Sequence, residues 1–234
     1  MVADPSRCPF LAAFAGPGVC HTAHMAYPPE PWSLRGRMFV SVWVLPAAAV
    51  PALPGELAGA VHVVRCAGRA VVGTAWVDYR PGGDMTYREL LAATLVRAGA
   101  RPRVTISHIW VDSVDSRDGG RELWGIPKEL AELAIGEGAA EAAAIASASL
   151  HGGTGLPVRL PVAFRVVQAL AAKVRTTPVR ATARYGTARV GWRVAPDGPL
   201  GFLAGRRPLL SVVADDFRMR FGTAQPAVDR GVAR

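Results

Sequence analysis

The residues best suited to chemistry lie in the segment "GGRELWGIPKELAEL", residues 119–133. Lys128 and Lys173 are the only lysines among 27 basic residues, because the chain otherwise uses arginine. A primary amine can condense with a ketone to form a Schiff base, which a guanidinium cannot do. The iminium then withdraws electrons, so that a neighbouring carbon can lose CO2 or a proton. Lys128 is therefore a candidate for covalent catalysis.

To attack a ketone the amine must be neutral, and the neighbours of Lys128 predict a lowered pKa. An ordinary lysine is neutral in only about one molecule in 2,500 at pH 7. Trp124, Ile126 and Leu130 supply apolar surroundings, and burial can lower a lysine pKa by about 3–5. Pro127 predicts a helix start, where the helix dipole would further disfavour the ammonium by about 0.3–1 kcal/mol. The alternative is an ordinary surface lysine at the start of a helix.

The elements that must position this lysine are predicted to be mainly strands. Strands are expected at 38–45 and 103–113, and as a pair within 60–79 around a turn at Ala67-Gly68. Thr86 and Glu89 form a capping box that predicts a helix over 86–99. A short helix is expected from Pro127, and loops are expected at 81–84 and 116–122. Segments 141–150 and 164–174 fit either type, and the remaining carboxy-terminal segments are expected to be strands.

This pattern predicts a single α+β domain built on an antiparallel sheet or barrel. We expect an irregular amino-terminal arm at 1–26, the domain at 27–225 and a tail at 226–234.

Composition narrows the class of protein. The net charge is +9, yet the arginines are spread along the chain and never form a run longer than two. This distribution favours attraction of small anions over a nucleic-acid partner. The three cysteines and five histidines lack metal-ligand spacing, and three prolines interrupt the longest uncharged run, 38–55. We expect a cytoplasmic protein with no metal, no membrane span and no nucleic-acid partner.

Four segments carry a resemblance to a known family. "GRELWGIPKEL" (120–130) resembles the active-site segment of the acetoacetate decarboxylase family, in which Gly-Arg-Glu leads to Pro-Lys. "SHIWVDS" (107–113), "YPPEPWSLRGRMFVSVWVLP" (27–46) and "YRPGGDMTYREL" (79–90) resemble further segments of that family. The resemblance covers about residues 27–133.

The resemblance implies a curved, largely closed antiparallel sheet around an apolar pocket, with a few short helices. It also implies a homo-oligomer and chemistry without a cofactor. Lys128 would be the Schiff-base amine and Glu89 a pocket carboxylate that handles protons. Arg35 would face the carboxylate of the substrate, with Arg37 as the alternative.

Three further residues have both a functional and a structural interpretation. Arg121 could bind a carboxylate bidentately, or it could pair with Glu122 or Asp112. Trp124 could wall the pocket or pack in the core. His108 could take part in the chemistry, although a histidine within a strand is more often part of the core.

Two departures from the family pattern keep several functions open. Glu129 stands where acetoacetate decarboxylase has a second lysine, and no glutamate lies near Gly73 or Thr74, where the family has one. The leading hypothesis is a cofactor-free lyase that decarboxylates a small β-keto acid. One alternative is an aldolase-dehydratase or cyclase that acts on a pyruvate-like substrate through the same lysine. Another is a non-catalytic barrel that binds small molecules.

Overall fold

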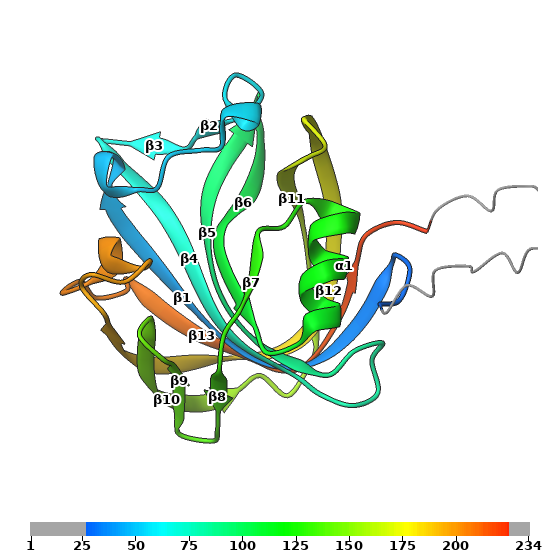
Figure 1. The fold of residues 1–234 in the computed structure, drawn as a ribbon. Coiled ribbons are helices and arrows are strands. Elements are labelled where there is room, and N and C mark those ends of the chain that lie inside the picture. Colours follow the sequence, from blue (N-terminus) through cyan, green and yellow to red (C-terminus); the bar gives the residue numbers. More distant parts are fainter. Residues whose placement is uncertain (1–26, 225–234) are drawn as a thin grey trace, which may run out of the picture.

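A computed structural model describes residues 27–224 of the 234-residue chain. These residues form one large curved sheet of thirteen strands, which is mostly antiparallel (Figure 1). The strands are β1 (Trp32–Pro46), β2 (His62–Val63), β3 (Arg65–Cys66), β4 (Arg69–Tyr79), β5 (Tyr87–Ala98), β6 (Arg101–Val111), β7 (Lys128–Leu130), β8 (Leu133–Ile135), β9 (Ala139–Ala142), β10 (Ala146–Gly155), β11 (Leu160–Leu170), β12 (Lys173–Val194) and β13 (Leu210–Phe221). Within the described residues there is one α-helix, α1 (Val114–Trp124), and three 3-10 turns, η1 (Ala47–Ala49), η2 (Gly55–Leu57) and η3 (Gly201–Leu203).

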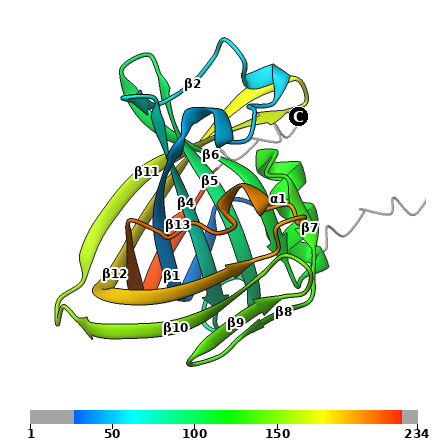
Figure 2. The same cartoon turned by 90° about the vertical axis from the view of Figure 1, so that its left-hand side faces the viewer.

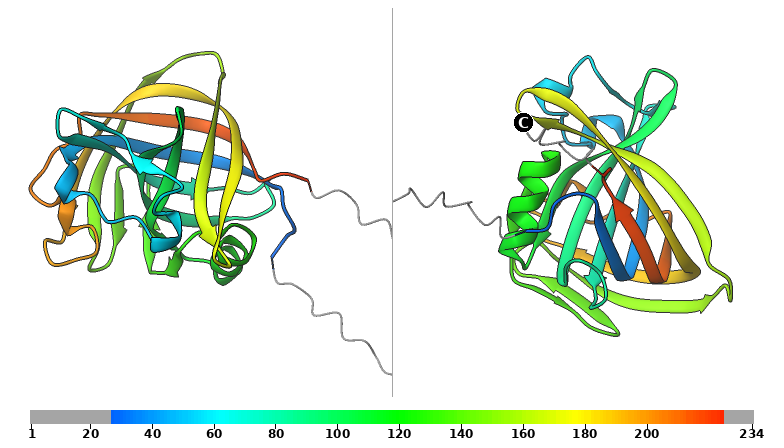
Figure 3. Two further views of the ribbon diagram at one scale, coloured as in Figure 1. Left: turned by 90° about the horizontal axis from the view of Figure 1, so that it is seen from above. Right: turned by 90° about the vertical axis from the view of Figure 1, so that its right-hand side faces the viewer.

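Seven strands form a near-ring, in the order β11-β6-β5-β4-β1-β13-β12, and β11 pairs again with β12. Strands β11 and β6 share the shortest pairing in the ring, a single parallel pair between Val166 and Val104. Strands β10, β9 and β8 continue from β12 and turn back across the outside of the ring (Figure 2). In the right-hand view of Figure 3, β11 and β12 run side by side across the molecule. The predicted curved, largely closed antiparallel sheet is confirmed, and the protein is mostly β.

Two large apolar cores pack on the two faces of the ring, and a smaller third cluster includes Leu57 of η2 and Val96 of β5. One cluster of buried side chains has members from all seven ring strands and therefore fills the inside. The other lies between the outer face of β1, β4 and β5 and the covering strands β8–β10. Strand β1 serves both: Trp32 and Leu34 face the inner core, whereas Phe39, Trp43 and Leu45 face the outer one. Side chains alternate along a strand, so the even-numbered residues of β1 face the inside of the ring and the odd-numbered residues face the outside. The even-numbered side chains are the more buried ones up to Gly36, and the odd-numbered ones are the more buried from Phe39 onward.

Strand β5 replaces the helix expected over 86–99, so that prediction was wrong. The apolar residues of "TYRELLAATLVRAG" recur at spacings that fit a helix, but this strand is buried on both faces. Tyr87 lies in the inner core, whereas Leu90 lies in the outer core. A strand covered on both sides carries apolar residues almost continuously, which hides the period of two.

The predictions for the segments before and after Gly125 were also wrong, because helix and extended chain are exchanged there. Residues 116–122 were predicted to be a loop but belong to α1. Residues 127–134 were predicted to be a helix but contain β7 and the start of β8. Ser113 caps α1 by accepting a hydrogen bond from the Ser116 backbone N–H (3.2 Å). Gly125 ends the helix in the left-handed region, with φ of 67°, and the chain then runs along the free edge of β6.

Other expectations are confirmed. Strands occupy 38–45, most of 103–113 and the pair around Ala67-Gly68, and the two ambiguous segments are strands for most of their length. The predicted arm, 1–26, and tail, 226–234, lie outside the described residues, as do Cys8 and Cys20. Among residues 27–224 no helix is long and apolar enough to cross a membrane.

Candidate functional site

Strand β7 aims the Lys128 side chain into the ring. Lys128 pairs in parallel register with Ile109 of β6, and Glu89 of β5 pairs with Val111 two residues further along β6. Paired residues point to the same face of a sheet, and Ile109 and Val111 both belong to the inner core. Lys128 and Glu89 are each only 3% exposed. The register therefore brings a buried amine and a buried carboxylate together.

The amine contacts a compact polar cluster. Lys128 Nζ lies 3.0 Å from Glu89 Oε2 and donates to Ser116 Oγ (2.9 Å) and to the Tyr87 hydroxyl (3.3 Å). The Tyr79 hydroxyl donates to the other oxygen of Glu89 (3.2 Å). The amine also lies over the Tyr87 ring, 4.8 Å from its centroid. Every polar atom around the amine thus has a partner, which compensates for its burial.

The surroundings of Lys128 act on its pKa in opposite directions. Burial is the largest influence and lowers the pKa, but the Glu89 carboxylate and the Tyr87 hydroxyl together raise it above its ordinary value of 10.5. The expected lowered pKa was therefore wrong for this arrangement. Apolar neighbours were visible in the sequence, whereas the carboxylate at 3.0 Å was brought in by the fold. The helix-dipole contribution is also lost, because Lys128 lies in a strand.

Two glycines in α1 create the space for this cluster. A Cβ atom on Gly120 would lie 2.6 Å from Lys128 Cδ, and one on Gly119 would lie 2.5 Å from an atom of the Trp32 ring. Glycine disfavours helices, which explains why the segment looked like a loop. The pair is tolerated because the Lys128 side chain and the Trp32 ring pack directly on the helix backbone. Figure 1 shows α1 standing beside β7.

Arg121 and Trp124 support the site from α1. Arg121 Nε donates to the backbone oxygen of Lys128 (2.6 Å), so the guanidinium holds the position of β7. Trp124 is buried, donates to Glu30 Oε2 (2.7 Å) and packs edge-on against Trp32. These contacts are structural, because Arg121 binds the backbone of Lys128 and Trp124 packs in the inner core.

His108 lies on the opposite face of the sheet from Lys128. It precedes Ile109 on β6, so its side chain points outward, where it stacks on Trp110 and lies at a tilt against Phe202. Partial burial lowers the pKa of His108, and the nearby Glu129 opposes that effect. Glu129 is exposed on this outer side, as expected from its place next to Lys128. The structure therefore does not bring His108 together with the amine.

Arg35 also lies away from Lys128. Its neighbour Leu34 faces the inner core, so Arg35 points to the outer face of β1. There it lies 3.8 Å from Asp216 and lines a surface groove. The alternative, Arg37, lies on the same outer face, 3.4 Å from Asp215.

Sequence reasoning missed Tyr87 and Ser116, which touch the amine. A helix over 86–99 would have turned Tyr87 away from Glu89, because helical residues two apart point about 200° apart. In a strand they share a face, and Tyr87 follows this rule. Ser116 carried no usable signal, since its segment was interpreted as a loop.

The inner face, which carries Lys128, has free space at Gly73, where the family resemblance implies a glutamate that this chain lacks. Gly73 pairs with Ala93, two residues along β5 from Leu91, and Ala93 and Leu91 both pack against the inner core. A Cβ atom on Gly73 would have nothing within 4 Å. The position that lacks the carboxylate therefore faces open space on the inner side of the ring.

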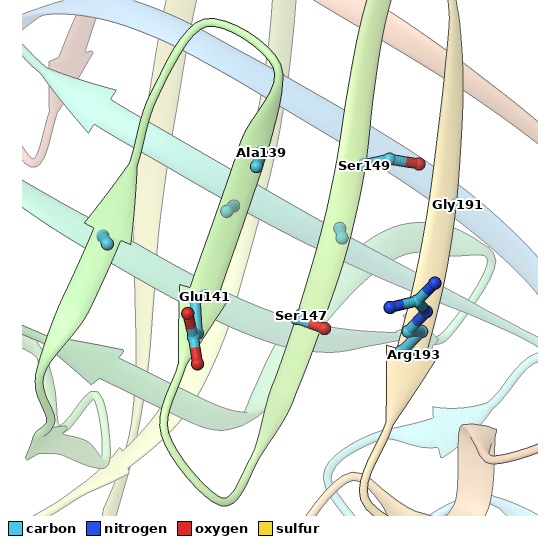
Figure 4. A pocket seen from close by; sticks show the side chains of 9 residues that line it. Ala139, Glu141, Ser147, Ser149, Gly191 and Arg193 are labelled. Atoms are coloured by element: carbon cyan, nitrogen blue, oxygen red, sulfur yellow. The ribbon is translucent and has the colours of Figure 1, made fainter.

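The described surface pockets lie elsewhere. One, of about 340 Å³, lies over β8, β9, β10 and β12 between Glu141 and Arg193 and has a floor of small side chains (Figure 4). Another, of about 790 Å³, is the groove that contains Arg35. Among residues 27–224 no three histidine, cysteine, aspartate or glutamate side chains gather as metal ligands.

Comparisons with known proteins relate this fold to one family. A sequence profile described as acetoacetate decarboxylase matches residues 20–200. No curated protein sequence matches the chain. Acetoacetate decarboxylase from Legionella pneumophila subsp. pneumophila str. Philadelphia 1 superposes with a TM-score of 0.59 at 17% identity, over 92% of this chain and 98% of that one. An acetoacetate decarboxylase-like enzyme from Sphingomonas wittichii RW1 gives 0.53 at 16% identity, over 83% and 92%.

A third structure, the enduracididine biosynthesis enzyme MppR complexed with pyruvate, gives a TM-score of 0.53 at 15% identity, over 88% of this chain and 92% of that one. At such identities the structures show a shared fold. The profile match extends over more than half of the sequence. The chain therefore belongs to the acetoacetate decarboxylase family.

Proposed function

We propose that the protein is a cofactor-free lyase that decarboxylates a small β-keto acid through a Schiff base on Lys128. The observation that carries this proposal is the buried amine of Lys128, which lies 3.0 Å from the buried carboxylate of Glu89 inside the ring. Membership of the acetoacetate decarboxylase family supports the same reaction class.

Because the pKa of Lys128 is raised, the first step of the reaction is the removal of a proton from the amine. The resting amine carries a proton, and Glu89 takes that proton when the carbonyl group of the substrate approaches. Transfer within the pair removes two buried charges at once, which lowers the cost of the transfer in a dry site. The neutral amine then adds to the carbonyl carbon to form a carbinolamine. Ser116 and Tyr87 both contact the nitrogen and fix its direction of attack.

Glu89 also serves the steps that follow. Its acid form donates a proton to the carbinolamine hydroxyl, which leaves as water and gives the iminium. The electrons of the bond to the carboxylate flow into the iminium, releasing CO2 and leaving an enamine. A proton from solvent, delivered through Glu89, converts the enamine into an iminium, and hydrolysis frees the ketone and the amine.

A second candidate reaction is aldol addition or dehydration of a pyruvate-like substrate by the same lysine. It is favoured by Gly73, which leaves open space where the family has a glutamate. The chain also lacks the second lysine that follows the reactive one in acetoacetate decarboxylase. Glu129 takes that position and is exposed on the face of the sheet opposite to the amine. The structure of MppR with pyruvate shows that a protein of this fold binds such a compound.

Reductive trapping tests both reactions. The protein is treated with borohydride and either acetoacetate or pyruvate, and the modified peptides are identified by mass spectrometry. We expect an adduct on Lys128 and none on the exposed Lys173, which serves as an internal reference. Lys128→Arg should abolish the adduct while keeping a positive charge.

The products distinguish the candidates. CO2 release with acetoacetate-like compounds supports the lyase, whereas trapping with pyruvate and no CO2 release supports the aldolase-dehydratase. An unmodified Lys128 with every compound would refute covalent catalysis and favour a non-catalytic binding barrel.

A further inference from the structure

Four arginines gather on the outer face of three neighbouring strands. Arg35 of β1 pairs with Arg218 of β13, and Arg180 of β12 pairs with Arg220 of β13. Because residues opposite each other and residues two apart on one strand share a face, all four point the same way. They line a groove of about 790 Å³, which we call the arginine groove.

This arrangement is unfavourable without a counter-charge. Like charges directly opposite each other on antiparallel strands are destabilising. Among residues 27–224 no ion pair is formed by Arg180, Arg218 or Arg220, and the groove lining includes no carboxylate. Asp216 lies 3.8 Å from Arg35, but Arg159 also binds this carboxylate. The excess positive charge of the groove is therefore open to an anion from solution.

We propose that the arginine groove binds a small molecule carrying two adjacent phosphate groups. A planar guanidinium binds phosphate through two parallel hydrogen bonds. The two cross-strand pairs, Arg35 with Arg218 and Arg180 with Arg220, form two adjacent rows, each suited to one phosphate.

The groove is partly preorganised and has room for an organic group. Gly82, at φ of +95°, lets the turn between β4 and β5 pass close to Arg35, since a Cβ atom there would lie 2.8 Å from the guanidinium. Pro161, Val162 and Ala163 of β11 add an apolar wall on the other side. A compound with a diphosphate and an apolar part fits both features.

The arginine groove is separate from the Lys128 site. Leu34 and Met219, which alternate with the arginines, pack toward the inner core that contains the amine. The sheet thus lies between the two sites, and binding at the groove does not depend on the proposed lyase activity.

Calorimetric titration with inorganic pyrophosphate at low salt tests the proposal. We expect one bound pyrophosphate per chain, held at least about tenfold more tightly than orthophosphate because both rows are engaged. The double variant R218Q/R220Q should weaken pyrophosphate binding by about tenfold or more. The matched control R189Q/R193Q removes the same charge from exposed positions of β12 and should bind like the wild type.

Three results would overturn the proposal: no binding at low salt, equal affinity for the two anions, or equal weakening in both double variants. The last would show attraction to net charge alone. Thermal melts check that each variant is folded. If R218Q/R220Q does not fold, R180Q on the neighbouring strand provides the same comparison.

Discussion

At the residue scale, the chemistry of Lys128 depends on a neighbour that the sequence does not place beside it. The apolar residues around position 128 indicated a neutral amine, but the fold adds Glu89 and Tyr87, which raise its pKa. The proposed Schiff-base formation then requires proton transfer within the cluster rather than a permanently neutral lysine. The burial of the amine agrees with its apolar neighbours in the sequence, and its contact with Glu89 agrees with the family resemblance. Its charge agrees with neither.

Replacing Glu89 should reverse the direction of this shift. In E89Q the carboxylate is lost and burial remains, so we expect the pKa of Lys128 to fall below 10.5. Because the chain has two lysines, the spectrum of protein with 15N-labelled lysine side chains should show two titrating signals, with the exposed Lys173 as reference. E129Q, which changes an exposed carboxylate on the opposite face, is the control. An unchanged pKa in E89Q would contradict the assigned ion pair.

Gly120 sets the path of the Lys128 side chain. In G120A the new methyl group would lie 2.6 Å from Lys128 Cδ, so the lysine must move away from Ser116. We expect a net destabilisation of about 1–3 kcal/mol from overpacking and a marked loss of reductive trapping.

The control for this change is G138A, because a Cβ atom at Gly138 meets nothing within 4 Å. Urea unfolding and the trapping yield are measured for both variants. Trapping in G120A at the wild-type yield would show that the lysine path has more freedom than the structure indicates.

At the element scale, the sequence predicted strands rich in β-branched residues better than strands rich in Leu and Ala. The segment 103–113 alternates clearly and forms most of β6. In contrast, β5 is covered on both sides, and its Leu- and Ala-rich sequence imitates a helix. The pair Gly119-Gly120 indicated a loop, but it lies in a helix. Glycine is required there because the Trp32 ring and the Lys128 side chain pack against these two residues. Such contacts between distant segments cannot be inferred from local propensity.

Strand β11 provides a prediction about assembly. Leu160, Val162 and Phe164 are 41–42% exposed along this strand, and adjacent exposed apolar side chains mark interaction surfaces. We propose that the protein is a homo-oligomer that buries the Leu160 and Phe164 side chains, which lie on the face of β11 opposite to Pro161 and Ala163 of the arginine groove. Light scattering should give a mass above that of one chain for the wild type, and L160D/F164D should lower it.

The exposed Leu209, in the segment that precedes β13, supplies the control. L209D introduces the same kind of charge at an apolar side chain that is 69% exposed, and it should leave the mass unchanged. A monomeric wild type would refute this proposal.

At the scale of the whole molecule, the buried polar cluster predicts how stability depends on alkaline pH. Burial raises the pKa of Tyr79 well above 10.0, and the pKa of Lys128 is raised above 10.5. The folded state therefore holds these protons more tightly than the unfolded chain does. The resulting stabilisation is fully present below about pH 10 and is lost as the pH rises through the folded-state values.

Urea unfolding between pH 8 and pH 11 measures this dependence. We expect the free energy of unfolding to fall above about pH 10, by at most about 1.4 kcal/mol per pH unit for each group. Y79F removes one of these protons and should show a shallower decline. A decline as steep as that of the wild type would show that Tyr79 does not contribute.

The change of buried face along β1 couples the two halves of the molecule. Trp32 anchors this strand inside the ring, and Trp43 anchors it under the covering strands. Neither apolar layer can be opened without displacing the same backbone. Amide hydrogens in the middle of β1 should therefore exchange with solvent only through global unfolding, and the two layers should melt as one cooperative unit.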